Sequence, residues 1–300
     1  MKQKFKGIFP ALLTPFKSDN TINEKALEEL VKLNLNKGVS GFYVGGSTGE
    51  AFLLSIDERK YILELVASIC KDKCVIISHV GAISTDQAIT LAKHAQRVGV
   101  DAISAVAPFY YKFSFGEVKK YYYDIVQSVD LPMIIYNFPD FSGVTFDSEN
   151  IKEFMENDSF IGMKHTSKDL YSFEQLSSKY PNKVFFNGFD EMFISGLVMG
   201  ASGGIGSTYN FMAEKFIKIK KHFDCGEIEL AMQEQVRANS IINILIKVGV
   251  FQGEKAILNM MGIDFGKCRR PFKPLTSEEI YLIENDIMPN LDVCILSKAN

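Results

Sequence analysis

Hydrophobic and polar positions alternate along this chain between two kinds of segment. Short, almost continuously apolar runs are typical of strands buried on both faces of a parallel sheet. Longer stretches repeat an apolar residue every three or four positions, as at Leu27, Leu30 and Val31, and this spacing predicts amphipathic helices. The strand-like runs are residues 7–14, 41–44, 75–80, 102–107, 132–136, 160–164, 184–187 and 203–206. The helix-like stretches that follow them are residues 23–37, 55–70, 84–98, 114–128, 148–155, 170–178, 191–199 and 210–223.

The order of these segments predicts the fold. Eight successive strand–helix units indicate parallel strands joined by crossover helices, and they fit a closed (β/α)8 TIM barrel of the α/β class better than an open sheet. The glycine-rich run at residues 203–206 is the weakest of the strands. After Cys225 the alternation stops, and residues 227–248, 254–261 and 277–288 have helical patterns. We expect residues 1–224 to form the barrel and residues 225–300 to form a C-terminal helical annex, together making a single structural domain.

Composition excludes several classes of function. Hydrophobic residues make up 47% of the chain and charged residues 23%, as in soluble globular proteins, and the net charge is −3. The absence of a long basic block argues against nucleic acid as a partner. No apolar run approaches the roughly 20 residues that cross a bilayer, and the start of the chain lacks the apolar core of a signal peptide. We therefore expect no membrane contact.

The cysteine and histidine patterns indicate neither a disulfide framework nor a metal site. The cysteines are odd in number and widely spaced, which indicates reduced thiols in a cytoplasmic protein. They are Cys70, Cys74, Cys225, Cys268 and Cys294. The four histidines show no metal-binding spacing. We expect neither a metal ion nor a cofactor.

Two strand ends indicate a reactive site. Lys164 ends the apolar run of residues 160–163, and Tyr136 ends the preceding apolar run. Burying a charged lysine is costly, and an amine there could act as a nucleophile toward a carbonyl, with the phenol as its proton partner. For an isolated lysine, an amine that reaches solvent from a strand end is the commoner case.

Polar residues also follow other predicted strands, and in a barrel these loops build one site. They occupy residues 45–50, 137–139, 165–167, 188–191 and 206–208. The first of them could equally be only a tight glycine turn. The chemistry indicated is Schiff-base formation on a keto acid. Ser47 and Thr48 would hold the carboxylate, Lys164 would attack the keto carbon, and Tyr136 would move protons. Lys168 lies past the strand end and is interpreted as solvated, while strand alternation points His165 away from the site.

Several segments resemble a known family. Gly-Gly-Ser-Thr-Gly-Glu at residues 45–50, Tyr-Asn-x-Pro at residues 136–139 and the lysine of the sixth strand resemble the class I pyruvate-dependent aldolases related to dihydrodipicolinate synthase and N-acetylneuraminate lyase. The resemblance runs from about residue 6 to residue 289. The stretches at residues 188–193 and 203–210, and the shorter ones at 108–111 and 142–144, resemble the N-acetylneuraminate lyase branch.

The resemblance implies cleavage of N-acetylneuraminate to N-acetyl-D-mannosamine and pyruvate. It implies that Lys164 forms the Schiff base, that Tyr136 shuttles protons, and that Ser47 and Thr48 hold the carboxylate, with Ser47 in the proton relay. It implies that Tyr110 comes from a neighbouring subunit of a homotetramer. The residues that would bind the polyhydroxy tail are Thr166, Gly188, Asp190, Glu191 and Ser207.

One departure from the family pattern bears on the substrate. Phe141 stands where dihydrodipicolinate synthases typically carry an arginine that meets a second carboxylate. Phe141 cannot bind a carboxylate, and its ring suits an acetamido methyl group or plain packing. Two alternatives stay open: another aldolase of the family, such as one for 2-keto-3-deoxy sugar acids, and a non-catalytic barrel that binds a metabolite.

Overall fold

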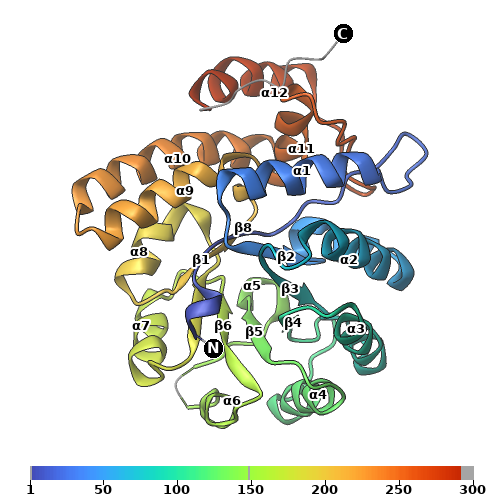
Figure 1. Cartoon of the computed structure of the whole chain (residues 1–300), viewed down its shortest axis with the longest axis vertical. Helices are drawn as coiled ribbons and strands as arrows, with labels where there is room; N and C mark the ends of the chain where they lie inside the picture. Colours follow the sequence, from blue (N-terminus) through green and yellow to red (C-terminus); the bar gives the residue numbers. More distant parts are fainter. Residues whose placement is uncertain (1, 148, 292–300) are drawn as a thin grey trace.

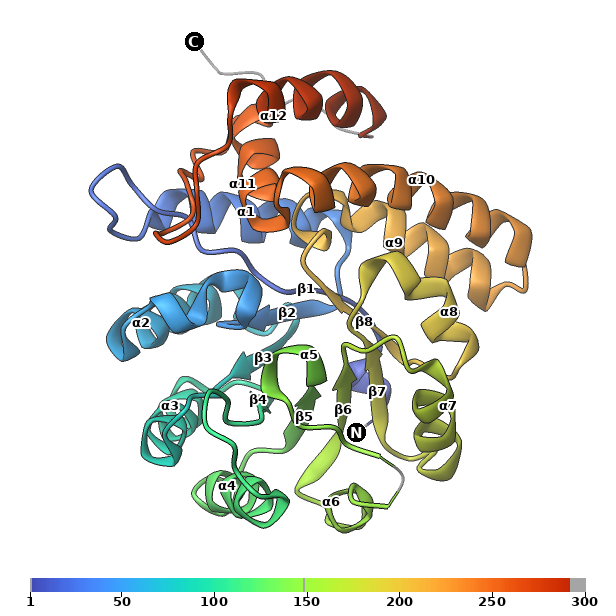
Figure 2. The same cartoon turned by 180° about the vertical axis from the view of Figure 1, so that it is seen from behind.

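Eight parallel strands form a barrel with helices around it (Figures 1 and 2). The structure is a computed structural model that describes residues 2–147 and 149–291. The sheet order is β1-β8-β7-β6-β5-β4-β3-β2, and a parallel bridge between Ala11 and Tyr43 joins the first strand to the second. The predicted (β/α)8 barrel with C-terminal helices is therefore confirmed. The strands are β1 Gly7–Pro10, β2 Gly41–Val44, β3 Val75–His79, β4 Ala102–Val106, β5 Met133–Asn137, β6 Phe160–His165, β7 Val184–Asn187 and β8 Gly203–Gly206.

The helices follow the predicted stretches closely. The α-helices of the barrel are α1 Glu24–Lys37, α2 Ile56–Cys70, α3 Thr85–Val98, α4 Phe115–Gln127, α5 Pro139–Ser142, α6 Lys152–Glu156, α7 Leu170–Lys179, α8 Phe193–Val198 and α9 Tyr209–Asp224. After them come α10 Ile228–Val248, α11 Val250–Met260 and α12 Ser277–Leu282. A capping box between Ser55 and Glu58 starts α2, and Gly99 ends α3 in the left-handed conformation.

Four boundaries differ most from the prediction. One is the start of α11, which begins at Val250 and not at residue 254. The first strand ends at Pro10. The Asn210 side chain hydrogen-bonds the backbone that follows, since its Nδ2 donates to Ala11 O and its Oδ1 accepts from Leu13 N. The helix expected from Ser148 begins at Lys152, and Ser148 itself lies outside the described residues. The helix expected to reach residue 288 loses α-helical geometry after Leu282.

Close backbone approach explains the glycine-rich β8. A Cβ atom on Gly203 would lie 1.9 Å from the carbonyl oxygen of Gly7 in β1. On Gly206, a Cβ atom would lie 1.7 Å from Oδ1 of Asp190. The strand therefore needs glycine for packing, although glycine weakens the strand pattern in the sequence.

Two apolar cores hold the barrel. The smaller fills its interior and includes Phe9, Tyr43, Tyr136 and Phe186. The larger lies between the sheet and the helices and runs from Ile8 to Leu291, so the C-terminal helices share it with the barrel. This sharing supports the expected single domain, although residues 292–300 of the expected annex lie outside the described range.

The C-terminal helices lie along one side of the barrel, with α10 beside α9 (Figures 1 and 2). Of the five cysteines, Cys70, Cys74, Cys225 and Cys268 are free thiols, and Cys294 lies outside the described residues. Within residues 2–147 and 149–291, the structure contains no helix with the length and apolarity that a membrane span requires.

Candidate active site

Strand pairing brings Lys164 and Tyr136 together inside the barrel. The pairing of β5 with β6 shifts by one residue near Met133, so that Ile134 pairs with Gly162 and Tyr136 with Lys164. Paired residues of neighbouring strands face the same side. Both side chains are buried, with 5% of Lys164 and 3% of Tyr136 exposed. The lysine therefore does not reach solvent from its strand end.

Aromatic rings surround the amine. Lys164 Nζ lies 4.2 Å from the ring centroid of Tyr136 and 4.7 Å from that of Tyr43. Burial lowers the pKa of Lys164 to about 7, and the Asp190 carboxylate opposes this shift. Because the charged form is desolvated, a large fraction of the amine is neutral and nucleophilic near pH 7.

The Tyr136 phenol lies among hydroxyl groups. Burial raises the pKa of Tyr136 to about 12, and the hydroxyls of Thr166 and Ser47 oppose the shift. The phenol is therefore protonated at neutral pH and has two hydroxyl neighbours on different loops with which it can exchange a proton. Its ring stacks on Phe138 at 5.8 Å between centroids.

The loop with Ser47 and Thr48 turns sharply after β2. Gly45 has a φ of +75°, and a Cβ atom on Gly46 would lie 2.7 Å from the Tyr43 ring. The Thr14 hydroxyl donates to Gly49 O at 2.8 Å and ties the loop to the segment after β1. The glycines thus let this loop pack closely against the ring that lines the Lys164 pocket.

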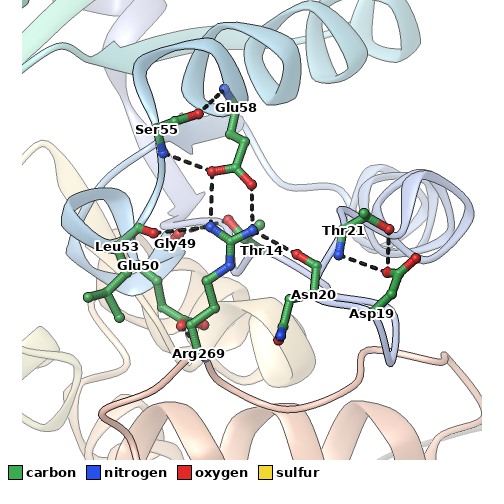
Figure 3. Close-up of polar contacts among 10 residues, drawn as sticks. All are labelled: Thr14, Asp19, Asn20, Thr21, Gly49, Glu50, Leu53, Ser55, Glu58 and Arg269. Carbon is green, nitrogen blue, oxygen red and sulfur yellow. Dashed lines mark hydrogen bonds and ion pairs between the residues drawn. The ribbon is translucent and has the colours of Figure 1, made fainter.

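The C-terminal region holds the same loop through Glu50. The Glu50 carboxylate is buried, binds Lys255 Nζ at 2.6 Å and accepts a hydrogen bond from the backbone N–H of Arg269 at 2.7 Å. The Arg269 guanidinium binds the carboxylate of Glu58 and the carbonyl oxygen of Leu53 (Figure 3). These contacts join α2, the loop and the segment after α11, so the loop is supported from outside the barrel.

Asp190 stands at the other side of Lys164, directly after β7. Its Oδ2 accepts hydrogen bonds from the backbone N–H of Thr208 at 2.9 Å and from the Thr208 hydroxyl at 2.7 Å. Its Oδ1 is buried and has no partner among the described residues. Burial raises the pKa of Asp190 to about 6, against the hydrogen bonds from Thr208. Burial and the Asp190 carboxylate also raise the pKa of the neighbouring Tyr209 phenol. One carboxylate oxygen therefore holds the loop, and the other can accept a hydrogen bond from the Tyr209 phenol or from a ligand.

Thr166, Gly188 and Ser207 complete this side. Thr166 Oγ1 is buried without a partner among the described residues, and a Cβ atom on Gly188 would lie 1.9 Å from it. Ser207 lies between β8 and α9, next to Thr208. Glu191 is partly exposed, and its carbonyl oxygen accepts from Asn239 Nδ2 at 3.0 Å.

The predicted residues fall into two groups according to the strand ends and loops that carry them. We call Lys164, Tyr136, Ser47 and Thr48 the lysine end. We call Thr166, Gly188, Asp190, Glu191 and Ser207 the aspartate end. Tyr136 links the ends through Thr166, and Lys164 links them through Asp190.

Tyr110 lies apart from both ends in this single chain. Its side chain is 85% exposed, and its ring meets that of Tyr111 edge-on at 5.1 Å. The backbone of Tyr110 has a φ of +79°, which is uncommon for a bulky residue. The loop after β4 therefore holds an exposed aromatic ring in a strained conformation.

An apolar cleft of about 460 Å³ opens beside the lysine end. Its walls include Ser47, Phe109, Phe138, Phe141 and Phe251, whereas the amine of Lys164 lies deeper. Phe141 packs its exposed ring on Phe138 at 4.2 Å between centroids. A larger cavity of about 600 Å³ is lined by Asn20 and by residues between positions 252 and 280. None of the predicted site residues lines it, so the size of a cavity alone does not identify the site.

The predictions for the two neighbours of Lys164 agree with the structure. His165 packs on Phe173 at 5.1 Å between ring centroids, and its two ring nitrogens face Asn137 Nδ2 and Asp169 O. Lys168 is exposed. Neither side chain joins the groups around the amine.

Sequence reasoning missed Tyr43 and Glu254, and it named the loops that contain Glu50 and Thr208 without giving these two residues a role. Tyr43 lies against the amine, Thr208 holds Asp190, Glu50 anchors the Ser47 loop, and Glu254 is buried beside Ser207. Tyr43 could have been found from strand alternation, because it occupies an inward position two residues before Gly45. Glu254 left a weaker signal, an acidic residue within the apolar pattern of a helix. Among the described residues, no group of three or more His, Cys, Asp or Glu side chains could hold a metal ion.

Comparisons with known proteins agree with this geometry. The chain is 44% identical over 290 residues to N-acetylneuraminate lyase from Escherichia fergusonii, covering 96% of this chain and 97% of that protein. The structure of CdNal from Clostridium difficile in complex with mannosamine matches with a TM-score of 0.91 and 40% identity over 93% of this chain and 97% of that one.

A further solved structure, N-acetylneuraminate lyase from Fusobacterium nucleatum complexed with pyruvate, matches with a TM-score of 0.90 and 37% identity over 95% of this chain and 98% of that one. Residues 4–288 match the sequence pattern of the Dihydrodipicolinate synthetase family. With nearly the whole chain matched and the barrel observed, the chain belongs to the Dihydrodipicolinate synthetase family.

Proposed function

We propose that this protein is a class I aldolase that cleaves N-acetylneuraminate to N-acetyl-D-mannosamine and pyruvate through a Schiff base on Lys164. The observation that carries the proposal is the buried amine, whose pKa is lowered to about 7 and which is paired in register with Tyr136. The relatives named lyases, and those bound to mannosamine and pyruvate, support the same reaction.

The reaction begins at the keto carbon of the open-chain sugar acid. The neutral Lys164 amine attacks this carbon, and loss of water leaves an iminium ion. A base then takes the proton of the hydroxyl on the fourth carbon, and the bond between the third and fourth carbons breaks. Its electron pair moves into the iminium, which becomes an enamine, and N-acetylmannosamine leaves as an aldehyde. Protonation of the enamine and hydrolysis release pyruvate and restore the amine.

Tyr136 moves the protons in these steps. Its phenol stays protonated until a neighbour accepts its proton, and Ser47 and Thr166 lie beside it. Ser47 would relay the proton, and Ser47 and Thr48 would bind the substrate carboxylate. A positioned proton shuttle of this kind contributes about 10²–10⁴ in rate.

The aspartate end would recognise the polyhydroxy tail. Asp190 Oδ1 and Thr166 Oγ1 are buried polar atoms without a hydrogen bond among residues 2–147 and 149–291, and Thr166 Oγ1 has the Tyr136 phenol as a neighbour. A buried acceptor that stays unpaired in the complex costs binding free energy. A ligand whose hydroxyls pair with these atoms should therefore bind more tightly than an analogue that lacks the hydroxyls. Glu191, Gly188 and Ser207 would contribute further contacts to the tail.

The direct test is a product assay with the purified protein. N-acetylneuraminate is supplied, and pyruvate and N-acetylmannosamine are both measured. We expect equal amounts of the two products and poor condensation of pyruvate with aspartate semialdehyde, because Phe141 offers no cation to a second carboxylate. Efficient condensation with aspartate semialdehyde, or cleavage only of 2-keto-3-deoxy sugar acids, would overturn the substrate assignment.

We also propose a homotetramer in which Tyr110 reaches the site of a neighbouring copy, in keeping with its exposed and strained position. Mixing inactive Lys164→Ala and Tyr110→Ala proteins after dissociation should restore part of the activity, since some sites would combine an intact Lys164 with a donated Tyr110. No restoration in a verified mixed oligomer would contradict donation between subunits. The cytoplasmic location expected from the thiols stays a prediction.

A further inference from the structure

Helix α11 buries two consecutive charged residues that face different ends of the site. Lys255 is 1% exposed and pairs with Glu50, which supports the lysine end. Glu254 is 0% exposed, and neither of its carboxyl oxygens has a partner among the described residues. A carboxyl group in such a position lowers the stability of the fold, because an apolar side chain of the same size would avoid the desolvation cost.

The Glu254 carboxyl lies beside the aspartate end. Burial raises its pKa well above the ordinary range, the Ser207 hydroxyl opposes that shift, and Asp190 adds to it. Lys255, the neighbouring cation, is engaged by Glu50 and by Lys267 O. Complete burial without a cation partner among the described residues favours the neutral form of the Glu254 carboxyl, and a neutral acid has an O–H to donate.

We propose that Glu254 is a positioning residue for the tail-binding end, donating its O–H to the Ser207 hydroxyl and so directing the hydrogen of that hydroxyl toward the substrate. The proposal rests on the proposed function. A serine that accepts one hydrogen bond still has its own hydrogen to give. A sugar hydroxyl that accepts from Ser207 could donate in turn to Asp190 Oδ1, which is buried and unpartnered. Chains of this kind strengthen each member.

The test compares two substitutions at one position. Glu254→Met keeps the length of the side chain and removes the donor, whereas Glu254→Gln keeps a neutral donor of the same shape. We expect Glu254→Met to raise KM for N-acetylneuraminate about three- to tenfold, the loss of one buried hydrogen bond, with kcat changed less than about twofold. Borohydride trapping of pyruvate should be unchanged, since pyruvate has no tail. Glu254→Gln should restore KM, and Glu229→Met on the exposed face of α10 is the matched control.

Transmission through Ser207 is tested by a double-mutant cycle. In a Ser207→Ala background, Glu254→Met should add less than about twofold to KM, because the group it orients is gone. Equal effects of Glu254→Met in both backgrounds would overturn the proposal, as would an unchanged KM in the single variant. A parallel loss of pyruvate trapping would assign Glu254 a merely structural role.

A folding defect and a failure of the proposed function can each be told apart from a failure of the role of Glu254. If Glu254→Met does not fold, Glu254→Asp withdraws the acid from Ser207 by one methylene and must raise KM, and an unchanged KM there overturns the proposal. If the wild-type protein forms the pyruvate adduct but does not cleave N-acetylneuraminate, the proposed function fails first. If it cleaves the sugar acid and the variants at position 254 match it, only the role of Glu254 fails.

Discussion

Buried carboxyl groups beside the two ends of the site differ in how completely their oxygens are paired. At the lysine end, Glu50 is fully paired, with Lys255 and the Arg269 backbone taking up both of its oxygens. At the aspartate end, one oxygen of Asp190 and both oxygens of Glu254 have no hydrogen-bond partner in the part of the chain that the structure describes. The paired carboxylate holds a loop in place. The unpaired ones retain hydrogen-bonding capacity, as a site that binds hydroxyl groups requires.

The same contrast separates chemistry from recognition. Burial among aromatic rings lowers the pKa of the Lys164 amine to about 7, and no carboxylate bonds to it directly within the described residues. A direct ion pair would keep the amine charged and unreactive. Asp190 is near enough to raise the pKa of Lys164, yet its hydrogen bonds go to Thr208. We therefore expect substitutions at the two ends to change amine reactivity and substrate recognition to different degrees, with the Asp190 charge acting on both.

The largest expected effect is at the lysine end. Tyr136→Phe keeps the ring that packs on Phe138 and Lys164 and removes only the hydroxyl. We expect kcat to fall by about 10²–10⁴ with the fold intact, because the proton shuttle is lost. Steady-state cleavage of N-acetylneuraminate and circular dichroism check this. Wild-type turnover at saturating substrate would remove the phenol from the mechanism.

The second effect concerns the stability of the paired end. Lys255→Met leaves the buried Glu50 carboxylate without its cation, and we expect the free energy of unfolding to fall by about 3–5 kcal/mol. Lys247→Met, at an exposed position of α10, is the control and should change it by less than about 0.5 kcal/mol. Urea denaturation measures both. If Glu50→Gln in the Lys255→Met background does not recover part of the loss, the pair is not the cause.

A third substitution tests the aspartate end alone. Asp190→Asn can keep the hydrogen bond from Thr208 and turns the free acceptor into a donor. We expect kcat/KM for N-acetylneuraminate to fall about 10- to 100-fold, since one hydrogen bond to a charged group is worth about 1.5–3 kcal/mol. Trapping of pyruvate with borohydride should stay nearly constant above pH 8, where the Lys164 amine is neutral in both proteins. Equal losses in both assays would show that Asp190 supports the barrel and does not read the sugar.

The smallest effect is a shift in pH dependence. Only the neutral amine attacks a carbonyl, so the rate of pyruvate adduct formation should rise about tenfold per pH unit up to about 7 and level off above it. Because the Asp190 carboxylate raises the pKa of Lys164, Asp190→Asn should move this midpoint to lower pH. Stopped reactions with pyruvate and borohydride across pH measure the profile. A midpoint near 10 would contradict a desolvated amine.

Much of the fold could be predicted from the sequence. Apart from the glycine-rich β8, the strands are short apolar runs, and the longer helices have a clear periodicity, so local patterns were sufficient to place them; the short helix α5 was not predicted. Lys164 and Tyr136 could be predicted as neighbours because both end apolar runs on successive strands. The end of β1 could not, because it depends on the side chain of Asn210, about 200 residues away in the sequence.

The contacts that support the site could not be predicted from the sequence for the same reason. Glu50 and Arg269 are 219 residues apart, and no local pattern connects them. The periodicity of α11 indicates which face is buried but does not reveal that Glu254 meets Ser207 and Lys255 meets Glu50. Tertiary contacts between polar groups follow from the packing of whole elements, which a single sequence does not encode locally.

The most direct test of the account is reductive trapping followed by peptide mapping. The protein is treated with pyruvate and borohydride, digested, and analysed by mass spectrometry, beside Lys164→Ala and Lys168→Ala variants. We predict one pyruvate adduct per chain on the peptide that contains Lys164, loss of the adduct in Lys164→Ala, and a nearly unchanged yield in Lys168→Ala. An adduct on Lys168, or none on a protein that still cleaves N-acetylneuraminate, would contradict the assignment of Lys164 as the nucleophile.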